Sequence, residues 1–160
     1  MKSSYNIILL LLLFTKSCEE LDTASEIPRI QYQDFIIKEY SPSGGSLSGT
    51  LVFRFTDGDG DVGLAQPQYD DSVTIDSIPY NLFIDRFDFE AEEYQLADTS
   101  LRFRLPYMEG GTYKENLEGT VEIQLYYPYV FSDSIRFHFY LFDRSGNKSN
   151  IEQSPSIGLN

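Results

Sequence analysis

Hydrophobic and polar residues alternate with a period of two along most of the chain after residue 28. In the segment 50–56, Leu51, Phe53 and Phe55 occupy every second position. The segment 135–141 repeats this alternation with branched and aromatic side chains. Period-two alternation rich in such residues is typical of strands with one buried face. The pattern predicts seven strands, near residues 30–40, 49–56, 80–89, 100–106, 118–126, 134–142 and 149–159.

Turn-forming residues separate these segments, and no segment after residue 18 has the apolar stripe of a helix. Glycine-containing turns are expected at 43–45, 57–60, 110–111 and 145–147. About seven antiparallel strands in one domain of this size predict an all-β fold. We expect a single immunoglobulin-like β-sandwich over residues 29–160, with a small barrel as the alternative.

The first residues have the layout of a secretory signal. Lys2 provides a positive charge, the segment 7–14 is an unbroken apolar run, and small and polar residues precede Cys18. The apolar run is too short to cross a bilayer as a helix, which takes roughly 20 residues. The competing interpretation is a buried N-terminal helix, but an all-round apolar run offers no amphipathic face. We therefore expect residues 1–17 to be a signal peptide.

Cys18 is the only cysteine of the chain, so it has no partner for an intramolecular disulfide. Residues 2–18 resemble the signal of a bacterial lipoprotein, although Thr15 and Lys16 differ from the residues common before the cut. The resemblance implies that the Cys18 thiol is acylated and becomes the first residue of the mature protein. Several acyl chains, as in that class, hold a protein stably at a membrane.

The chain is strongly acidic, with a formal net charge of −13 at pH 7. Such a charge argues against nucleic acid as a partner and against electrostatic attraction to anionic lipids. It favours cation binding, or serves only solubility. The polar and acidic segment 18–28 has no periodicity, so we interpret it as a flexible tether between anchor and domain.

The clearest candidate for site chemistry is the loop that carries Asp57, Asp59 and Asp61. Carboxylates at alternate positions of a glycine-rich loop can surround one point, and Ca²⁺ accepts several oxygen ligands in irregular geometry. The loop resembles the first half of an EF-hand, but Val62 and Gln68 replace the expected Gly and Glu. The competing interpretation is a solvated acidic turn between strands. We expect a Ca²⁺ site that takes its other ligands from elsewhere.

The other ligands would come from loops at the same end of the sandwich. If the seven strands follow immunoglobulin order, the loop 57–61 lies beside the loops 109–115 and 143–147. Asp143 and Asn147 then become candidate metal ligands alongside the three aspartates. This assignment depends on the assumed strand order.

Two motifs carry a wider resemblance. The segments 55–61 (FTDGDGD) and 143–150 (DRSGNKSN), taken with Cys18, resemble a group of uncharacterised surface lipoproteins of the Bacteroidota. The resemblance implies a protein anchored by lipid in the outer membrane and exposed at the cell surface. Glu19, Glu20 and Asp22, behind the cysteine, look like the acidic export signal of these proteins, and a generic acidic tether is the alternative. The group itself implies no activity.

We therefore expect a non-enzymatic binding or structural module, whose partner is a surface protein complex or a glycan. Tyr126, Tyr127 and Tyr129 are the candidate platform of a glycan-binding module of a polysaccharide-uptake system, although packing around Pro128 is the favoured explanation for them. His138 is the only histidine, so the sequence offers no histidine cluster for zinc. A hydrolase that uses paired carboxylates is the remaining alternative, but no pair stands out in so acidic a chain.

Overall fold

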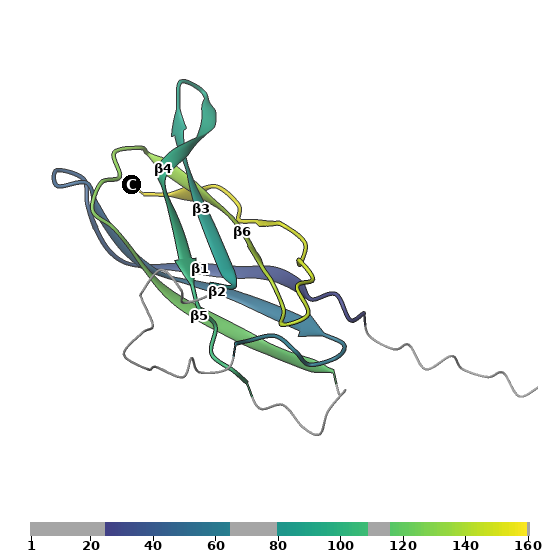
Figure 1. The fold of residues 1–160 in the computed structure, drawn as a ribbon. Coiled ribbons are helices and arrows are strands. Elements are labelled where there is room, and N and C mark those ends of the chain that lie inside the picture. The colour runs from purple at the N-terminus through teal and green to yellow at the C-terminus, as the bar shows by residue number, and fades with distance from the viewer. Residues whose placement is uncertain (1–24, 65–79, 109–115, 160) are drawn as a thin grey trace, which may run out of the picture.

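The computed structural model describes residues 25–64, 80–108 and 116–159. Within them, eight strands form two antiparallel sheets (Figure 1). None of these residues belongs to a helix that could cross a bilayer. The strands are β1 (Arg29–Ser41), β2 (Ser46–Asp57), β3 (Leu82–Glu90), β4 (Glu93–Phe103), β5 (Leu117–Tyr127), β6 (Ser134–Leu141), β7 (Glu152–Gln153) and β8 (Ile157–Gly158).

The two sheets pack face to face as a β-sandwich, which confirms the predicted fold class. One sheet has the order β1-β2-β5, and the other has the order β4-β3-β6-β7 with β8 also paired to β6. In the constant-type immunoglobulin order the fourth strand belongs to the sheet of the first, second and fifth. Here β4 pairs with β3 in the opposite sheet. The immunoglobulin-like subtype therefore stays a prediction.

The core lies between the sheets and is built from the alternating positions that the sequence pattern identifies. Phe53 of β2 packs on Phe139 of β6 with ring centroids 5.2 Å apart, and both side chains are fully buried. Phe35 of β1 packs on Phe137 at 4.9 Å. Gly49 makes room for Phe35, because a Cβ atom there would lie 2.4 Å from its ring. These pairs join the sheets across the sandwich.

The predicted strand near 149–159 is wrong in its length. It is two short strands, β7 and β8, separated by Ser154, Pro155 and Ser156. The Ser154 hydroxyl accepts a hydrogen bond from the Phe137 backbone N–H at 2.9 Å, a role that a strand carbonyl would otherwise fill. Ser149 accepts from the Leu141 N–H in the same way at 3.0 Å. The serine backbone N–H groups still donate to the Phe137 and Leu141 carbonyls, so the side chains replace only the carbonyl acceptors along this edge of β6.

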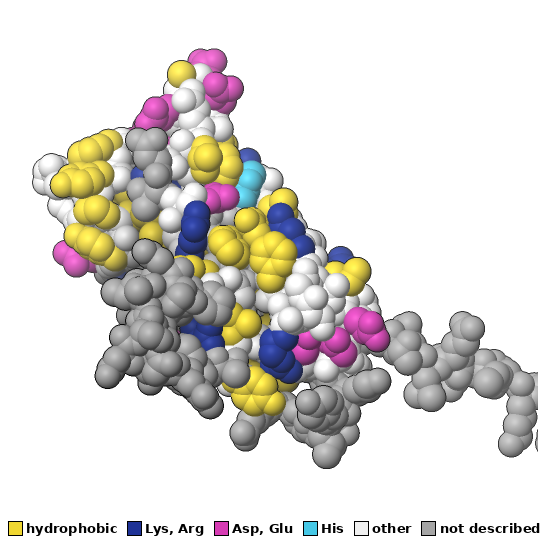
Figure 2. All heavy atoms as spheres, in the orientation of Figure 1, with side chains coloured by type: hydrophobic (Ala, Val, Ile, Leu, Met, Phe, Trp, Pro, Cys, Tyr) yellow, Lys and Arg dark blue, Asp and Glu magenta, His cyan; other side chains and the backbone are white. Residues whose placement is uncertain are grey.

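The predicted strand near 100–106 is also wrong, because β4 begins at Glu93 and ends at Phe103. β3 and β4 form a hairpin in which Glu90 pairs with Glu93 across a two-residue turn. The turn residues Ala91 and Glu92 both have positive φ, at 49° and 68°. Two-residue turns of this geometry normally contain Asn and Gly, which the segment lacks. The hairpin projects beyond the other strands, and acidic side chains occupy its tip (Figures 1 and 2).

Replacing the two turn residues with Ala91→Asn and Glu92→Gly is expected to stabilise the protein by about 1 kcal/mol. The new residues adopt positive φ with less strain than Ala and Glu do. Urea unfolding followed by circular dichroism measures the change. The neighbouring Glu93→Gly variant is the control, and it should lose stability because Gly weakens a strand. If the turn and strand variants change the free energy of unfolding equally, the turn residues are not strained.

Candidate metal centre

The acidic loop begins where β2 ends, at Asp57. The Asp57 carboxylate folds the loop back on itself: its Oδ2 accepts hydrogen bonds from the backbone N–H groups of Asp61 at 2.7 Å and Val62 at 3.1 Å. Gly60 takes a φ of 70°, which glycine adopts without strain. Side-chain to backbone hydrogen bonds of this kind, four and five residues along the chain, hold the loop closed. The turn brings the three aspartates onto one side of the loop.

Asp57, Asp59 and Asp61 form a group that could hold a metal ion. One carboxylate oxygen from each lies within 4.8 Å of the other two. Two oxygens bound to the same Ca²⁺ are at most about 5 Å apart, twice the usual bond length. The Oδ1 atom of each aspartate is buried and has no hydrogen-bond partner among the described residues. Three buried acceptors without donors are what a bound cation would satisfy.

The electrostatics of the group also favour a cation. Asp57 is only 1% exposed. Burial, followed by the negative charges of Asp59 and Asp61, raises the pKa of Asp57 from 3.8 to about 6, against the lowering effect of the Asp61 and Val62 backbone N–H groups. Arg144 lies close, but its guanidinium donates to the carbonyls of Gly60 at 3.4 Å and Gly63 at 3.1 Å. It forms no ion pair with the three carboxylates.

The turn at 143–147 does lie against the acidic loop, as the assumed topology requires. Contact is made by Ser145, whose backbone N and Oγ both donate to Asp61 Oδ2, at 3.0 and 2.7 Å. Asp143 instead accepts hydrogen bonds from Asn147, at 2.7 Å from the backbone N and 2.8 Å from Nδ2. Asp143 and Asn147 therefore shape the turn, and their role as metal ligands stays a prediction.

Two structural residues of the centre were missed by sequence reasoning. Ser145 fixes Asp61, but a serine in a turn gives no specific signal. Gly63 has a φ of 94°, and a Cβ atom there would lie 2.3 Å from the Pro106 carbonyl oxygen. Gly63 therefore holds the end of the loop against the segment after β4. Some of the predicted features lie outside the described residues: Cys18, the tether up to residue 24, Gln68 and the loop 109–115.

The predicted tyrosine platform is only partly exposed. Tyr127 is 1% exposed and belongs to the core, whereas Tyr126 and Tyr129 are 62% and 72% exposed.

His138 lies on the outer face of β6 against Phe87, with ring centroids 4.2 Å apart. Burial, and then the charge of Arg136, lower its pKa. A structural role for His138 agrees with this packing.

The raised pKa of Asp57 predicts that the cation-free protein loses stability as the pH rises. The folded state holds the Asp57 proton more tightly than the unfolded chain does. The stabilisation by this proton is complete below pH 3.8 and is lost as the pH rises through about 6. Between pH 4 and pH 7 in metal-free buffer, the wild type should lose about 2 kcal/mol relative to Asp57→Asn. Urea unfolding of both proteins at each pH measures this difference. A difference that does not change with pH would contradict the raised pKa.

Comparison of the chain with protein-family models, curated proteins and solved structures finds no significant match.

Proposed function

We propose that the chain is a lipid-anchored, extracytoplasmic binding module whose β-sandwich is stabilised by Ca²⁺ at Asp57, Asp59 and Asp61. The observation that carries the metal proposal is the convergence of three carboxylates whose buried Oδ1 atoms have no donors. A solvated acidic turn would instead expose these oxygens to water. The burial of Asp57 next to two further carboxylates is unfavourable without a counter-charge.

The donor set supports Ca²⁺ over other metals. The three aspartates supply only oxygen, and neither histidine nor cysteine belongs to the group among the described residues. Zinc and copper sites are usually built with nitrogen or sulfur ligands, whereas Ca²⁺ takes carboxylate, carbonyl and water oxygens. Mg²⁺ demands a near-ideal octahedron, which an irregular loop provides less readily than the adaptable shell of Ca²⁺.

A bound cation would stabilise one end of the sandwich. Asp61 is hydrogen-bonded to Ser145 and, through its carbonyl, to the backbone N of Arg144 at 3.2 Å. An ion held by Asp61 would therefore fix both the loop after β2 and the turn after β6. The ion has a structural role in this proposal, and the module's partner binds elsewhere.

Titration calorimetry tests the metal site directly. The wild type should bind one Ca²⁺ per chain, and Mg²⁺ should bind more weakly. Asp59→Asn removes one ligand charge and should lower the Ca²⁺ affinity at least tenfold. Glu122→Gln, an exposed position on β5, removes the same charge far from the centre and should leave the affinity unchanged. An equal loss in both variants would show that overall charge, and not this centre, attracts the ion.

The lipid anchor is a separate part of the proposal and rests on the single Cys18 behind an apolar segment. It places the domain at the outer membrane, facing either the periplasm or the cell surface. Mass spectrometry of the protein from the membrane fraction should find a mature N-terminus at Cys18 that carries acyl chains. Cys18→Ser should move the protein into the soluble fraction. A free Cys18 thiol in the wild type would remove the anchor from the proposal.

A further inference from the structure

A polar groove lies at the end of the sandwich opposite the metal centre. The β3–β4 hairpin forms one wall, and the segment after β5 forms the other. The groove has a volume of about 390 Å³, within the range of small-molecule sites. Its β3 side chains are Asp88 and Glu90, next to the buried Arg86, and Gln95 and Tyr129 complete the polar lining.

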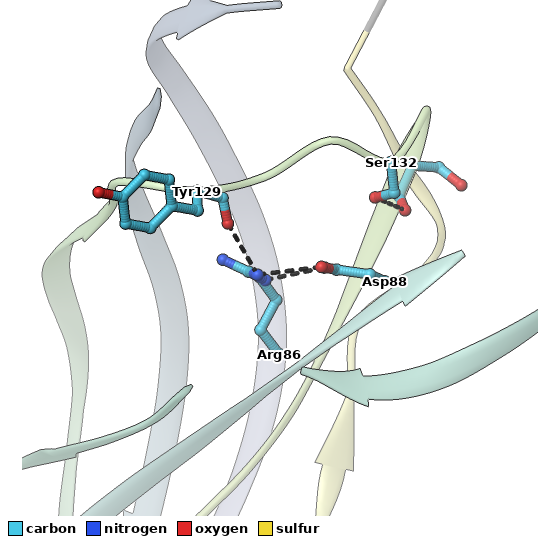
Figure 3. A network of polar contacts seen from close by, with 5 residues as sticks. Arg86, Asp88, Tyr129 and Ser132 are labelled. Carbon is cyan, nitrogen blue, oxygen red and sulfur yellow. Dashed lines mark hydrogen bonds and ion pairs between the residues drawn. The ribbon is translucent and has the colours of Figure 1, made fainter. Parts of the chain in front are cut away.

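The floor of the groove is rigid. The Arg86 guanidinium donates to both Asp88 carboxylate oxygens, from Nε at 2.8 Å and from Nη2 at 2.9 Å, and Nη2 also donates to the Tyr129 carbonyl at 3.1 Å (Figure 3). The same guanidinium lies 4.5 Å from the centroid of the Tyr127 ring. Arg86 is only 5% exposed. Packing and paired hydrogen bonds therefore hold Arg86, Asp88 and the Tyr129 backbone in one geometry.

Several groups at this groove are not used by the fold. Nη1 of Arg86 has no hydrogen-bond partner within the described parts of the chain. Glu90 is exposed, and among the described residues the Gln95 side chain bonds one other side chain, that of the exposed Glu93. The Tyr129 ring is 72% exposed, and in Figure 3 it extends away from Asp88. If Arg86 and Asp88 served only to tie β3 to the segment after β5, none of these exposed groups would be needed.

The charge of the groove selects the class of ligand. Arg86 is neutralised by Asp88, and Glu90 adds a further negative charge, so an anionic ligand would be repelled. Carboxylate, amide and guanidinium groups together can both accept from and donate to neighbouring hydroxyl groups. The exposed tyrosine ring offers an apolar face for the C–H side of a sugar ring. These features fit a neutral saccharide.

We propose that this groove binds a neutral saccharide, one or two sugar units at a time. Tyr129 stacks on a sugar ring, while Asp88, Glu90, Gln95 and the free Nη1 of Arg86 bind its hydroxyl groups. The strained turn at Ala91 and Glu92 supports the proposal, because it belongs to the hairpin that forms one wall of the groove. The site does not depend on the metal centre, since Asp57 and Tyr127 lie at opposite ends of the β2–β5 ladder.

The aromatic residues on the outer face of the larger sheet do not compete as a sugar platform. Phe83 and Tyr140 stack on each other, with centroids 5.2 Å apart and an interplanar angle of 11°. Lys148 lies 3.7 Å from the centroid of the Tyr140 ring. These ring faces are already covered by protein groups. Hydrophobic side chains also gather at the end of the sandwich near the β1–β2 hairpin (Figure 2), and Phe131 packs there on Gly45.

Native affinity electrophoresis in gels that contain starch, xylan, galactomannan or mixed-linkage β-glucan tests the proposal. At least one of these neutral polysaccharides should retard the wild type, in EGTA as well as in Ca²⁺. Tyr129→Ala should weaken that binding about tenfold, since loss of ring stacking is worth roughly 1.4 kcal/mol. Gln95→Ala should weaken it severalfold. Because Tyr129 and Gln95 are exposed, both variants should keep the thermal midpoint of the wild type, which is measured alongside.

Tyr126→Ala is the matched control, because Tyr126 is an equally exposed tyrosine three residues away that does not line the groove. This variant should bind like the wild type. The proposal is overturned if none of the four polysaccharides retards the wild type. It is also overturned if Tyr129→Ala binds as tightly as the wild type, or if Tyr126→Ala weakens binding as much as Tyr129→Ala does. Because saccharide binding is also measured in EGTA, its result does not depend on whether the protein binds Ca²⁺.

Discussion

Saturating Ca²⁺ is expected to raise the midpoint of thermal unfolding by about 8 °C. A ligand present at 100 times its dissociation constant stabilises the folded state by about 2.7 kcal/mol, provided that it binds only that state. For a domain of this size, each kcal/mol shifts the midpoint by about 3 °C. The unfolded chain holds no preformed site, because the three carboxylates converge only when Asp57 folds the loop.

Scanning calorimetry in Ca²⁺, in Mg²⁺ and in EGTA measures the shift. Asp59→Ala should abolish the response to Ca²⁺, because it removes a ligand whose Oδ1 is buried in the centre. Glu122→Gln should keep the full response. A wild-type midpoint that is the same in Ca²⁺ and in EGTA would end the calcium proposal, whatever the variants do.

Gly63→Ala is expected to destabilise the protein by about 3 kcal/mol, through overpacking and backbone strain together. The new Cβ atom would lie 2.3 Å from the Pro106 carbonyl oxygen, and backbone at that position cannot yield as a flexible side chain does. The φ of 94° adds strain for any residue with a Cβ atom. The change also displaces the Gly63 carbonyl that accepts from Arg144. Ca²⁺ affinity should therefore fall together with stability.

Gly146→Ala separates the clash from the backbone strain. Gly146 has a φ of 85°, but a Cβ atom there would meet nothing within 4 Å. This variant should cost only about 1 kcal/mol. Chemical unfolding of the two variants gives the comparison, and similar losses in both would mean that the contact with Pro106 has little importance.

Five of the strands could be predicted within a few residues of their observed ends. Alternation such as that of Leu51, Phe53 and Phe55 is a local property, and it directly encodes which face of a strand meets the core. The β4 start could not be predicted. The turn at Ala91 and Glu92 lacks the Asn-Gly signal, and the pairing of β3 with β4 on either side of it holds it in place. The break between β7 and β8 depends on Ser154 bonding a strand far away in sequence.

The candidate metal group could also be predicted in part, because Asp57, Asp59 and Asp61 are neighbours in the sequence. Their spacing and the glycines between them are local information. Burial of Asp57 and the contact between Asp61 and Ser145 are not, since they depend on two loops that are 84 residues apart. The two loops are neighbours as expected, although β4 does not follow the assumed immunoglobulin order. Ser145 and Arg144 make the contacts with Asp61, and the role of Asp143 and Asn147 as metal ligands stays a prediction.

The sequence by itself therefore determined the all-β fold class, the strand faces and the aspartate cluster. Cys18, with the anchor predicted from it, is likewise a feature of the sequence alone. Tertiary structure decided which polar groups lack hydrogen-bond partners among the described residues, including the buried Oδ1 atoms of the aspartates and Nη1 of Arg86. The physical reason is that whether a polar atom lacks a hydrogen-bond partner depends on every group around it. Those neighbours come from distant strands and loops, which the local pattern of residues does not specify.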